Sequence, residues 1–337
     1  MSEPVFRVEG LQVDVNIRGS RIVVIDGVSF SIAPGESLAL VGESGSGKSL
    51  IALGAVDLLP RGARVVGGRT FFEGRALQDL EDADWRRLVG MGIGVLFQDA
   101  VGAWDPMEIL GTQSGEALGT HTEMSDEEIR DRVLDALGEV QLPRRLKYVS
   151  FAHQVSRGQA QRAMLASALL AAPRVLIADE PLSGLDVTVA RAVLDLIDDL
   201  RRRRGMGLLM VTHDLGVVAS VADRVAVVYG GTLVEVAATD VLYHFPKHPY
   251  TDGLLGSVPG FARGRLRPIE GDAPELWELP EGCSFGPRCP YAVDRCRRER
   301  PAARPVDGTR VACHLAEDLD LQGIRGDRPE RGRAGSG

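Results

Sequence analysis

The feature that most constrains this chain is a glycine-rich motif, GESGSGKS, at residues 42–49. It matches the pattern GxxxxGK[ST] and lies between an apolar run, residues 37–41, and a helical pattern that begins at Ser49. Glycines in such a loop let the backbone turn tightly, so that successive N–H groups point at phosphate oxygens beside a helix N-terminus. Lys48 is expected to reach the β- and γ-phosphates of a nucleotide, and the Ser49 hydroxyl to hold Mg²⁺. The predicted nucleotide contacts in this segment are Gly42, Glu43, Ser44, Gly45, Ser46, Gly47, Lys48, Ser49 and Leu50.

Two further apolar runs, residues 174–179 and 207–213, end as the first does, in small, polar or charged residues. Short apolar runs alternate with helical patterns from about residue 5 to 240, which is typical of βαβ units and a mainly parallel sheet. The carboxyl ends of such strands meet at one edge, where open α/β sheets bind ligands. We therefore expect an α/β fold whose chemistry collects at that edge.

Charged and polar side chains follow these runs. Asp179 and Glu180 end the second run, and burying two adjacent carboxylates unpaired would be costly unless a bound Mg²⁺ offsets the cost. We assign Asp179 to the metal, and Glu180 to the attacking water, which it orients or deprotonates. His213, at the end of the third run, is expected near the γ-phosphate. Gln98 follows another strand-like run and is expected near Mg²⁺ or the water.

The pattern changes twice along the chain. Between about residues 100 and 172 it becomes helical, which predicts a helical insert within the α/β domain. Past about residue 245 it becomes rich in proline and glycine. We expect a first domain at 1–245, a small loop-rich C-terminal lobe at 246–318, and a disordered tail at 319–337.

The order of the motifs resembles the nucleotide-binding subunit of ATP-binding cassette (ABC) transporters. The phosphate motif at 42–49 and Gln98 are followed by VSRGQ at 155–159, which corresponds to the signature helix of this family. SGLD at 183–186 then follows the acidic pair Asp179 and Glu180. Segments 248–260 (HPYTDGLLGSVPG) and 279–296 (LPEGCSFGPRCPYAVDRC) resemble the C-terminal extension of dipeptide and oligopeptide importer ATPases. The resemblance implies a P-loop NTPase of ABC type that hydrolyses ATP with Mg²⁺.

The resemblance also implies partners. In this family the signature helix meets ATP bound by the other subunit of a dimer, so Ser156, Gly158 and Gln159 are expected to face the partner's γ-phosphate, with Asp186 at the dimer seam. Ser156 and Gln159 also form an S-x-x-Q capping box, the pattern of an ordinary helix start. The implied assembly contains a second, non-identical ATPase subunit, two transmembrane permease subunits and an extracytoplasmic solute-binding protein. It would import peptides or similar small solutes.

Three departures from the family pattern stand out. Arg157 replaces a glycine of the signature, and no aromatic residue occurs at 16–21, where the family often stacks one on adenine. The segment DAVGAWDP at 99–106 also differs, and the resemblance places it near the permease-facing surface.

All four cysteines lie near the C-terminus: Cys283, Cys289, Cys296 and Cys313. In a reducing compartment such a group is more often a metal or cofactor site than a disulfide framework. The paired knuckles typical of zinc are absent from the spacing, and the resembling importers imply a [4Fe–4S] cluster here. Zinc, free thiols and a disulfide remain alternatives. Arg288, Arg295 and Arg297 could offset the charge of an anionic cluster.

Composition and hydropathy exclude some classes. The net charge of −8 argues against nucleic acid or an anionic membrane surface as the main partner. The longest nearly uncharged apolar stretch, residues 163–172, is well short of the roughly 20 residues that span a bilayer. Because the start of the chain carries Glu3 and no apolar core, it does not read as a secretory signal. We expect a protein at the cytoplasmic face of the membrane, held there through the permeases.

Two other functions use a phosphate loop. A soluble ABC-type ATPase of DNA repair or translation would usually carry long coiled-coil insertions or two cassettes, which this sequence lacks. A P-loop kinase acting on a small metabolite would leave residues 155–159 and 183–186 without a role.

Overall fold

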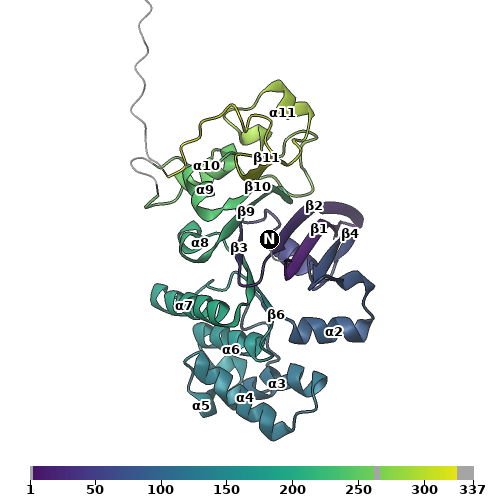
Figure 1. Ribbon diagram of the computed structural model, residues 1–337, viewed down its shortest axis with the longest axis vertical. Coiled ribbons are helices and arrows are strands. Elements are labelled where there is room, and N and C mark those ends of the chain that lie inside the picture. The colour runs from purple at the N-terminus through teal and green to yellow at the C-terminus, as the bar shows by residue number, and fades with distance from the viewer. Residues whose placement is uncertain (1–2, 262–265, 325–337) are drawn as a thin grey trace, which may run out of the picture.

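The computed structural model describes residues 3–261 and 266–324. Figure 1 shows three regions stacked along the long axis: a helical insert at one end, the main sheet in the middle and a C-terminal lobe at the other end. We use the name C-terminal lobe for residues 246–261 and 266–324. None of the described helices is both long and apolar enough to cross a lipid bilayer.

The main sheet has eight strands in the order β11-β12-β10-β9-β3-β8-β7-β6. The strands β6, β7, β8, β3 and β9 pair in parallel, as the sequence predicts, and β10, β11 and β12 extend the sheet in antiparallel fashion. The bounds are β3 (Ser37–Val41), β6 (Ile93–Leu96), β7 (Val175–Asp179), β8 (Gly207–Val211), β9 (Arg224–Tyr229), β10 (Thr232–Ala238), β11 (Arg304–Val306) and β12 (Thr309–Val311).

Every residue of β3, β7 and β8 is buried, because both faces of the sheet are covered. One face, with Leu40 and Ile177, packs on α1 (Lys48–Gly54) and on a second sheet. The other face, with Leu176, packs on α6 (Arg157–Leu169) and α7 (Val187–Arg204). This burial leaves only the strand ends for chemistry.

The second sheet is antiparallel, in the order β2-β1-β4-β5, and lies beside the main sheet in Figure 1. One face of this sheet packs on the core and the other is more exposed, as the alternating burial at the end of β2 shows. The bounds are β1 (Phe6–Ile17), β2 (Ser20–Ile32), β4 (Ala63–Phe72) and β5 (Arg75–Ala76), followed by η1 (Leu77–Asp79) and α2 (Asp82–Met91).

The predicted insert is helical. It contains α3 (Leu110–His121), α4 (Asp126–Glu139), α5 (Arg144–Tyr148), η2 (Ala152–Gln154) and α6. Two capping boxes start helices here: Ser125 with Glu128 at α4, and Ser156 with Gln159 at α6. Each box supplies partners to backbone N–H groups that a helix leaves free in its first turn.

The C-terminal lobe is joined to the main sheet by strand pairing. In β12, Arg310 and Val311 pair with Val236 and Glu235 of β10, so the sheet runs across the predicted boundary at residue 245. The remaining helices are α8 (Leu215–Val221), α9 (Thr239–His244), α10 (Pro249–Gly256), η3 (Gly286–Arg288) and α11 (Asp294–Arg298).

Residues 319–324, which we expected to begin a disordered tail, pack on the lobe instead. Leu321 is 3% exposed, and the Gly323 N–H donates to an Asp252 carboxylate oxygen at 2.7 Å. The rest of that predicted tail, 325–337, lies outside the described residues.

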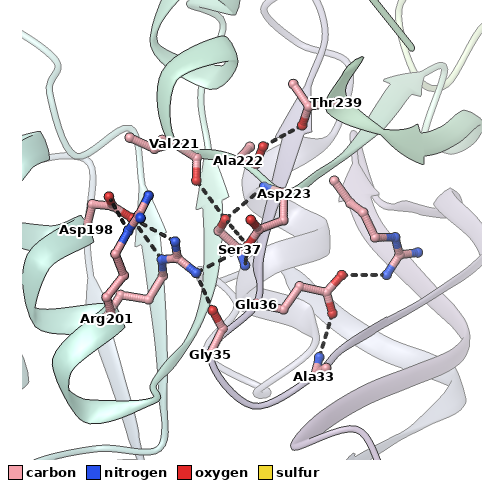
Figure 2. Close-up of polar contacts among 12 residues, drawn as sticks. Ala33, Gly35, Glu36, Ser37, Asp198, Arg201, Val221, Ala222, Asp223 and Thr239 are labelled. Atoms are coloured by element: carbon pink, nitrogen blue, oxygen red, sulfur yellow. Dashed lines mark hydrogen bonds and ion pairs between the residues drawn. The ribbon is translucent and has the colours of Figure 1, made fainter. Parts of the chain in front are cut away.

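A polar network holds the amino ends of β3 and β9 together (Figure 2). The Ser37 N–H and hydroxyl both donate to Asp223 Oδ2 at 2.8 Å, and the Asp223 N–H donates back to Ser37 Oγ at 2.9 Å. Arg201, on the last turn of α7, donates to Asp223, to Asp198 and to the Gly35 carbonyl. The network fixes the register of the strands at the edge opposite the predicted site.

Replacing Arg201 should therefore destabilise the fold. The Arg201 side chain is 5% exposed, so Arg201→Leu leaves the Gly35 carbonyl and the Asp223 carboxylate without this donor. We expect the free energy of unfolding, measured by urea denaturation, to fall by about 2 kcal/mol.

The matched control is Arg202→Leu. Arg202 also pairs with Asp198, but its side chain is 67% exposed, so its removal should cost less than about 0.5 kcal/mol. Equal losses for the two variants would contradict the role given to the network.

Candidate functional site

The phosphate loop is held so closely that two of its glycines have no substitute. A Cβ atom on Gly42 would lie 2.3 Å from the Val228 carbonyl oxygen of β9. A Cβ on Gly47 would lie 2.6 Å from Ile25 of β2, and Gly47 also has a φ of 101°, in the left-handed region. The loop is therefore shaped by the sheets on either side of it.

Lys48 follows this turn and is 7% exposed. Its Nζ donates to the carbonyl oxygens of Gly42 and Glu43, each at 2.9 Å, so the side chain folds back over the loop. Burial lowers the pKa of Lys48, while the carboxylates of Glu180, Asp179 and Glu43 oppose that shift. The loop thus presents a cation with acidic groups close by.

Ser49 and Asp179 come together from α1 and the end of β7. The Ser49 hydroxyl donates to Asp179 Oδ1 at 2.9 Å, and Asp179 is 3% exposed. Burial raises the pKa of Asp179, and the hydrogen bond from Ser49 opposes the rise. A hydroxyl and a carboxylate are oxygen ligands of the kind that Mg²⁺ prefers, so this pair fits the metal.

A second observation supports a polar ligand at the loop. The Ser46 hydroxyl is buried and has no hydrogen-bond partner among the described residues. Leaving such a group unpaired costs free energy unless a bound molecule supplies the partner.

Glu180 has an unusual backbone. Its φ is 46°, and its N–H donates to the Val211 carbonyl of β8 at 2.9 Å. Residues with side chains are rarely held in the left-handed region, and those that are cluster at functional sites. Glu180 Oε1 lies 2.9 Å from His213 Nδ1, so the ends of β7 and β8 meet as expected.

One pocket brings together eight of the thirteen residues expected around the nucleotide bound by this chain. Its described wall does not include the other five, which are Gly42, Glu43, Ser46, Asp179 and His213. It is lined by Lys48, Ser49, Gln98 and Glu180, with Ser44, Gly45, Gly47 and Leu50 also on its wall. The pocket also has a wall that the sequence analysis missed: Glu275, Leu276 and Trp277 of the C-terminal lobe. Their only signal in the sequence is an apolar pair inside a polar segment.

The residues expected to meet a partner's nucleotide lie elsewhere. Ser156 caps α6, Asp186 caps α7, and both are exposed; neither is on the described wall of the pocket. The two helix starts are neighbours, because a Cβ on Gly158 would lie 3.5 Å from Leu185. Arg157, the departure from the signature, packs against Gly184 of the SGLD segment.

All four cysteines lie in the described part of the lobe, and none of them forms a disulfide. Cys296 and Cys313 are buried, and burial raises the pKa of Cys313 to about 11, with smaller contributions from the other three thiols. In the described part of the chain, no three His, Cys, Asp or Glu side chains are arranged to hold a metal ion.

Two of the three arginines expected to offset the charge of the cysteines, Arg288 and Arg295, pair with carboxylates instead. Arg295 pairs with Glu299, and Arg288 with Glu43 of the phosphate loop.

Comparisons with known proteins agree with this arrangement. A family model described as ABC transporter matches residues 25–183, and one described as oligopeptide/dipeptide transporter, C-terminal region, matches residues 234–296. The dipeptide transport ATP-binding protein DppD of Bacillus subtilis is 42% identical, over 94% of this chain and 96% of its own length. Its namesake in Escherichia coli is 37% identical, over 92% of this chain and 96% of its own length.

Solved structures show the same fold. A bacterial ABC transporter cassette solved as a dimer has a TM-score of 0.62 at 25% identity and covers 69% of this chain and 98% of its own. A post-hydrolysis ATP-binding cassette with bound ADP and phosphate has a TM-score of 0.63 at 24% identity, with the same coverage. From the phosphate loop, the strand ends and the relatives that span nearly its whole length, the chain belongs to the ATP-binding proteins of oligopeptide and dipeptide ABC transporters.

Proposed function

We propose that this chain binds and hydrolyses ATP to energise a membrane importer of dipeptides, oligopeptides or similar small solutes. The observation that carries the proposal is the meeting of Lys48, Ser49 and Glu180 in one pocket, together with relatives named for dipeptide transport. The C-terminal region matched at 234–296 gives no support to a repair ATPase or a small-molecule kinase.

The residues of the site would divide the work. Lys48 and the loop N–H groups would bind the β- and γ-phosphates, and Ser49, Asp179 and Gln98 would hold Mg²⁺. The metal would neutralise charge that develops on the phosphate oxygens. Glu180 would accept a proton from the attacking water, and His213, whose ring lies against that carboxylate, would keep it oriented toward the γ-phosphate.

The exposed starts of α6 and α7 support a dimeric mechanism. Ser156, Gly158 and Gln159 would bind ATP held by a second ATPase subunit, and Asp186 would lie at the seam between the two. We propose that this second subunit is a non-identical paralogue. ATP binding would close the dimer, and hydrolysis would reopen it.

We further propose a division of the chain into an ATPase domain at 1–245, with its helical insert at about 100–172, and a C-terminal extension at 246–318. The assembly would include two permease subunits and an extracytoplasmic solute-binding protein, so the chain would sit at the cytoplasmic face of the membrane.

Glu180→Gln tests the assigned base. Since the amide cannot accept the proton, ATP hydrolysis by the transporter complex should fall by about 10² or more, while the Kd for MgATP changes less than about threefold. Hydrolysis would be followed by phosphate release and binding by nucleotide titration.

Glu278→Gln is the control, because Glu278 is an exposed carboxylate next to Trp277. It should hydrolyse ATP at the wild-type rate. Normal turnover in Glu180→Gln would refute the assignment.

An apolar surface on the insert fits the permease contact. The segments around Ile109 and Phe151 are joined by a β-bridge, and the Leu110 N–H donates to the Ser150 carbonyl at 2.8 Å. The exposed apolar side chains that flank this junction are Met107 at 82%, Leu146 at 61% and Val149 at 57%. Motion at the Gln98 loop would reach the permeases through this surface.

Leu146→Asp should disrupt that contact. A charge on this apolar surface should reduce co-purification of the permeases about tenfold or more, without changing the Kd for MgATP. Val66→Asp is the control, since Val66 is an exposed valine of β4 outside this surface. Equal co-purification of the two variants would rule out the proposed surface.

We propose that the four cysteines hold a [4Fe–4S] cluster, with zinc as the alternative. Thiolates suit both. The proposal rests on the four cysteines that this part of the lobe provides; in the described residues they are not arranged around a metal ion. The bound cluster or zinc ion would stabilise a lobe that has few helices and strands.

Metal analysis of anaerobically purified protein tests the cysteine proposal. We expect four irons per chain and visible absorption, both lost in Cys296→Ser and retained in Ser284→Ala. Zinc without iron would overturn the choice of cluster.

A further inference from the structure

A buried arginine of the C-terminal lobe contacts the phosphate loop. Arg288 is the last residue of η3, and its side chain is 7% exposed. Its Nη1 and Nη2 lie 2.7 and 3.0 Å from the two carboxylate oxygens of Glu43, the second residue of the phosphate motif. This is the two-bond geometry that gives arginine–carboxylate pairs their strength and direction.

The other donors of Arg288 are also used. Its Nε donates to the Glu270 carbonyl at 3.1 Å, Nη2 to the Gly271 carbonyl at 2.9 Å, and Nη1 to the Tyr229 hydroxyl at 3.4 Å. A guanidinium has five N–H groups, and each of them here has an acceptor. A lysine, with three donors on one atom, could not make these contacts.

The carbonyl groups held by Arg288 begin the segment that covers the pocket. Leu276 packs in the hydrophobic core that includes Ile25, and its Cδ1 lies 3.6 Å from the position of a Cβ on Gly47. Trp277 forms a wall of the pocket that contains Lys48. Arg288 therefore ties the phosphate loop to the segment that lies over it.

Aromatic packing fixes Arg288 in turn. Phe285, at the start of η3, is 2% exposed, and its ring centroid lies 5.2 Å from that of Tyr229 and 5.3 Å from that of Tyr250. The Tyr250 hydroxyl accepts the Glu43 N–H at 2.8 Å. Glu43 is thus held by the lobe at both its backbone and its carboxylate.

We propose that Arg288 is a positioning residue for the ATP site, which neutralises and orients Glu43 and so makes nucleotide affinity depend on the folded C-terminal lobe. The inference rests on the proposed function of the loop as an ATP site. It gives the lobe a role in nucleotide binding that neither the phosphate motif nor the cysteines predict.

The physical reason is electrostatic. Without Arg288, the Glu43 carboxylate is left unpaired at a loop that must receive the anionic phosphates of ATP. Glu43 is also close enough to Lys48 to act on its pKa, after the larger effects of burial and of Glu180 and Asp179. An unpaired Glu43 would compete with the phosphates for Lys48.

The experiment is a titration of the full-length chain with MgATP, for Arg288→Gln, Glu43→Gln and the double variant. We expect Arg288→Gln to raise the Kd about tenfold. The double variant should bind more tightly than Arg288→Gln, because the unpaired carboxylate is gone. Arg288→Lys should recover only part of the affinity, since it restores charge without the paired geometry.

Arg295→Gln is the matched control. Arg295 also precedes a cysteine in the lobe, but it is exposed and pairs with Glu299 alone. It should leave the Kd unchanged. Thermal unfolding of each variant shows whether it is folded. If Arg288→Gln fails to fold, Glu43→Gln still tests the electrostatic argument: it removes the carboxylate and leaves the Arg288 guanidinium beside the loop, so the Kd should fall.

The outcomes separate the two proposals. If the wild-type chain does not bind MgATP, or binds it equally well after Lys48→Ala, the proposed function fails. The positioning role is wrong if the wild-type chain binds MgATP and the folded Arg288→Gln and Glu43→Gln variants both bind it with the wild-type Kd. If Arg288→Gln lowers the unfolding temperature but leaves the Kd for MgATP unchanged, Arg288 stabilises the fold and has no role in nucleotide binding.

Discussion

The parallel register of β3, β7 and β8 is the constraint on which the rest of the structure depends. Val211 of β8 pairs with Leu40 on one side and with Asp179 on the other, so all three strands end at the same level. Because these strands are buried on both faces, their polar residues can occur only at the ends. The register, pinned at the opposite edge by Ser37 and Asp223, therefore brings the functional side chains together.

The C-terminal lobe contributes to the phosphate site, although it is distant from the phosphate loop in the sequence. Its hairpin β11–β12 extends the main sheet through β10, and its aromatic and arginine side chains hold Glu43. The lobe also supplies Trp277 to the pocket wall.

The core of the fold and the centre of the site could be predicted from the sequence because their signals are local. The phosphate motif lies directly between a strand and a helix, and Asp179 and His213 mark strand ends in the pattern itself. The capping box of Ser156 and Gln159 is likewise a pattern of four residues, and the structure contains it.

The contacts of the lobe could not be predicted in this way. Arg288 and Glu43 are 245 positions apart, and their pairing depends on how η3 packs against Tyr229 and Tyr250. Nothing in the sequence around Arg288 indicates that Glu43 is its partner. Its position beside Cys289 predicts only that its charge offsets that of the cysteines. The packing of residues 319–324 on the lobe could not be predicted for the same reason. It depends on a hydrogen bond between the Gly323 N–H and Asp252, which are far apart in the sequence.

The central claim is that one magnesium–nucleotide site forms where the three strands end. A crystal structure of the full-length chain with Mn²⁺ and a non-hydrolysable ATP analogue would test it most directly, because the anomalous signal locates the metal independently of the surrounding density. We expect a metal peak within bonding distance of the Ser49 hydroxyl, next to Asp179, with the triphosphate against Lys48. A metal bound elsewhere, or a nucleotide that leaves this pocket empty, would contradict it.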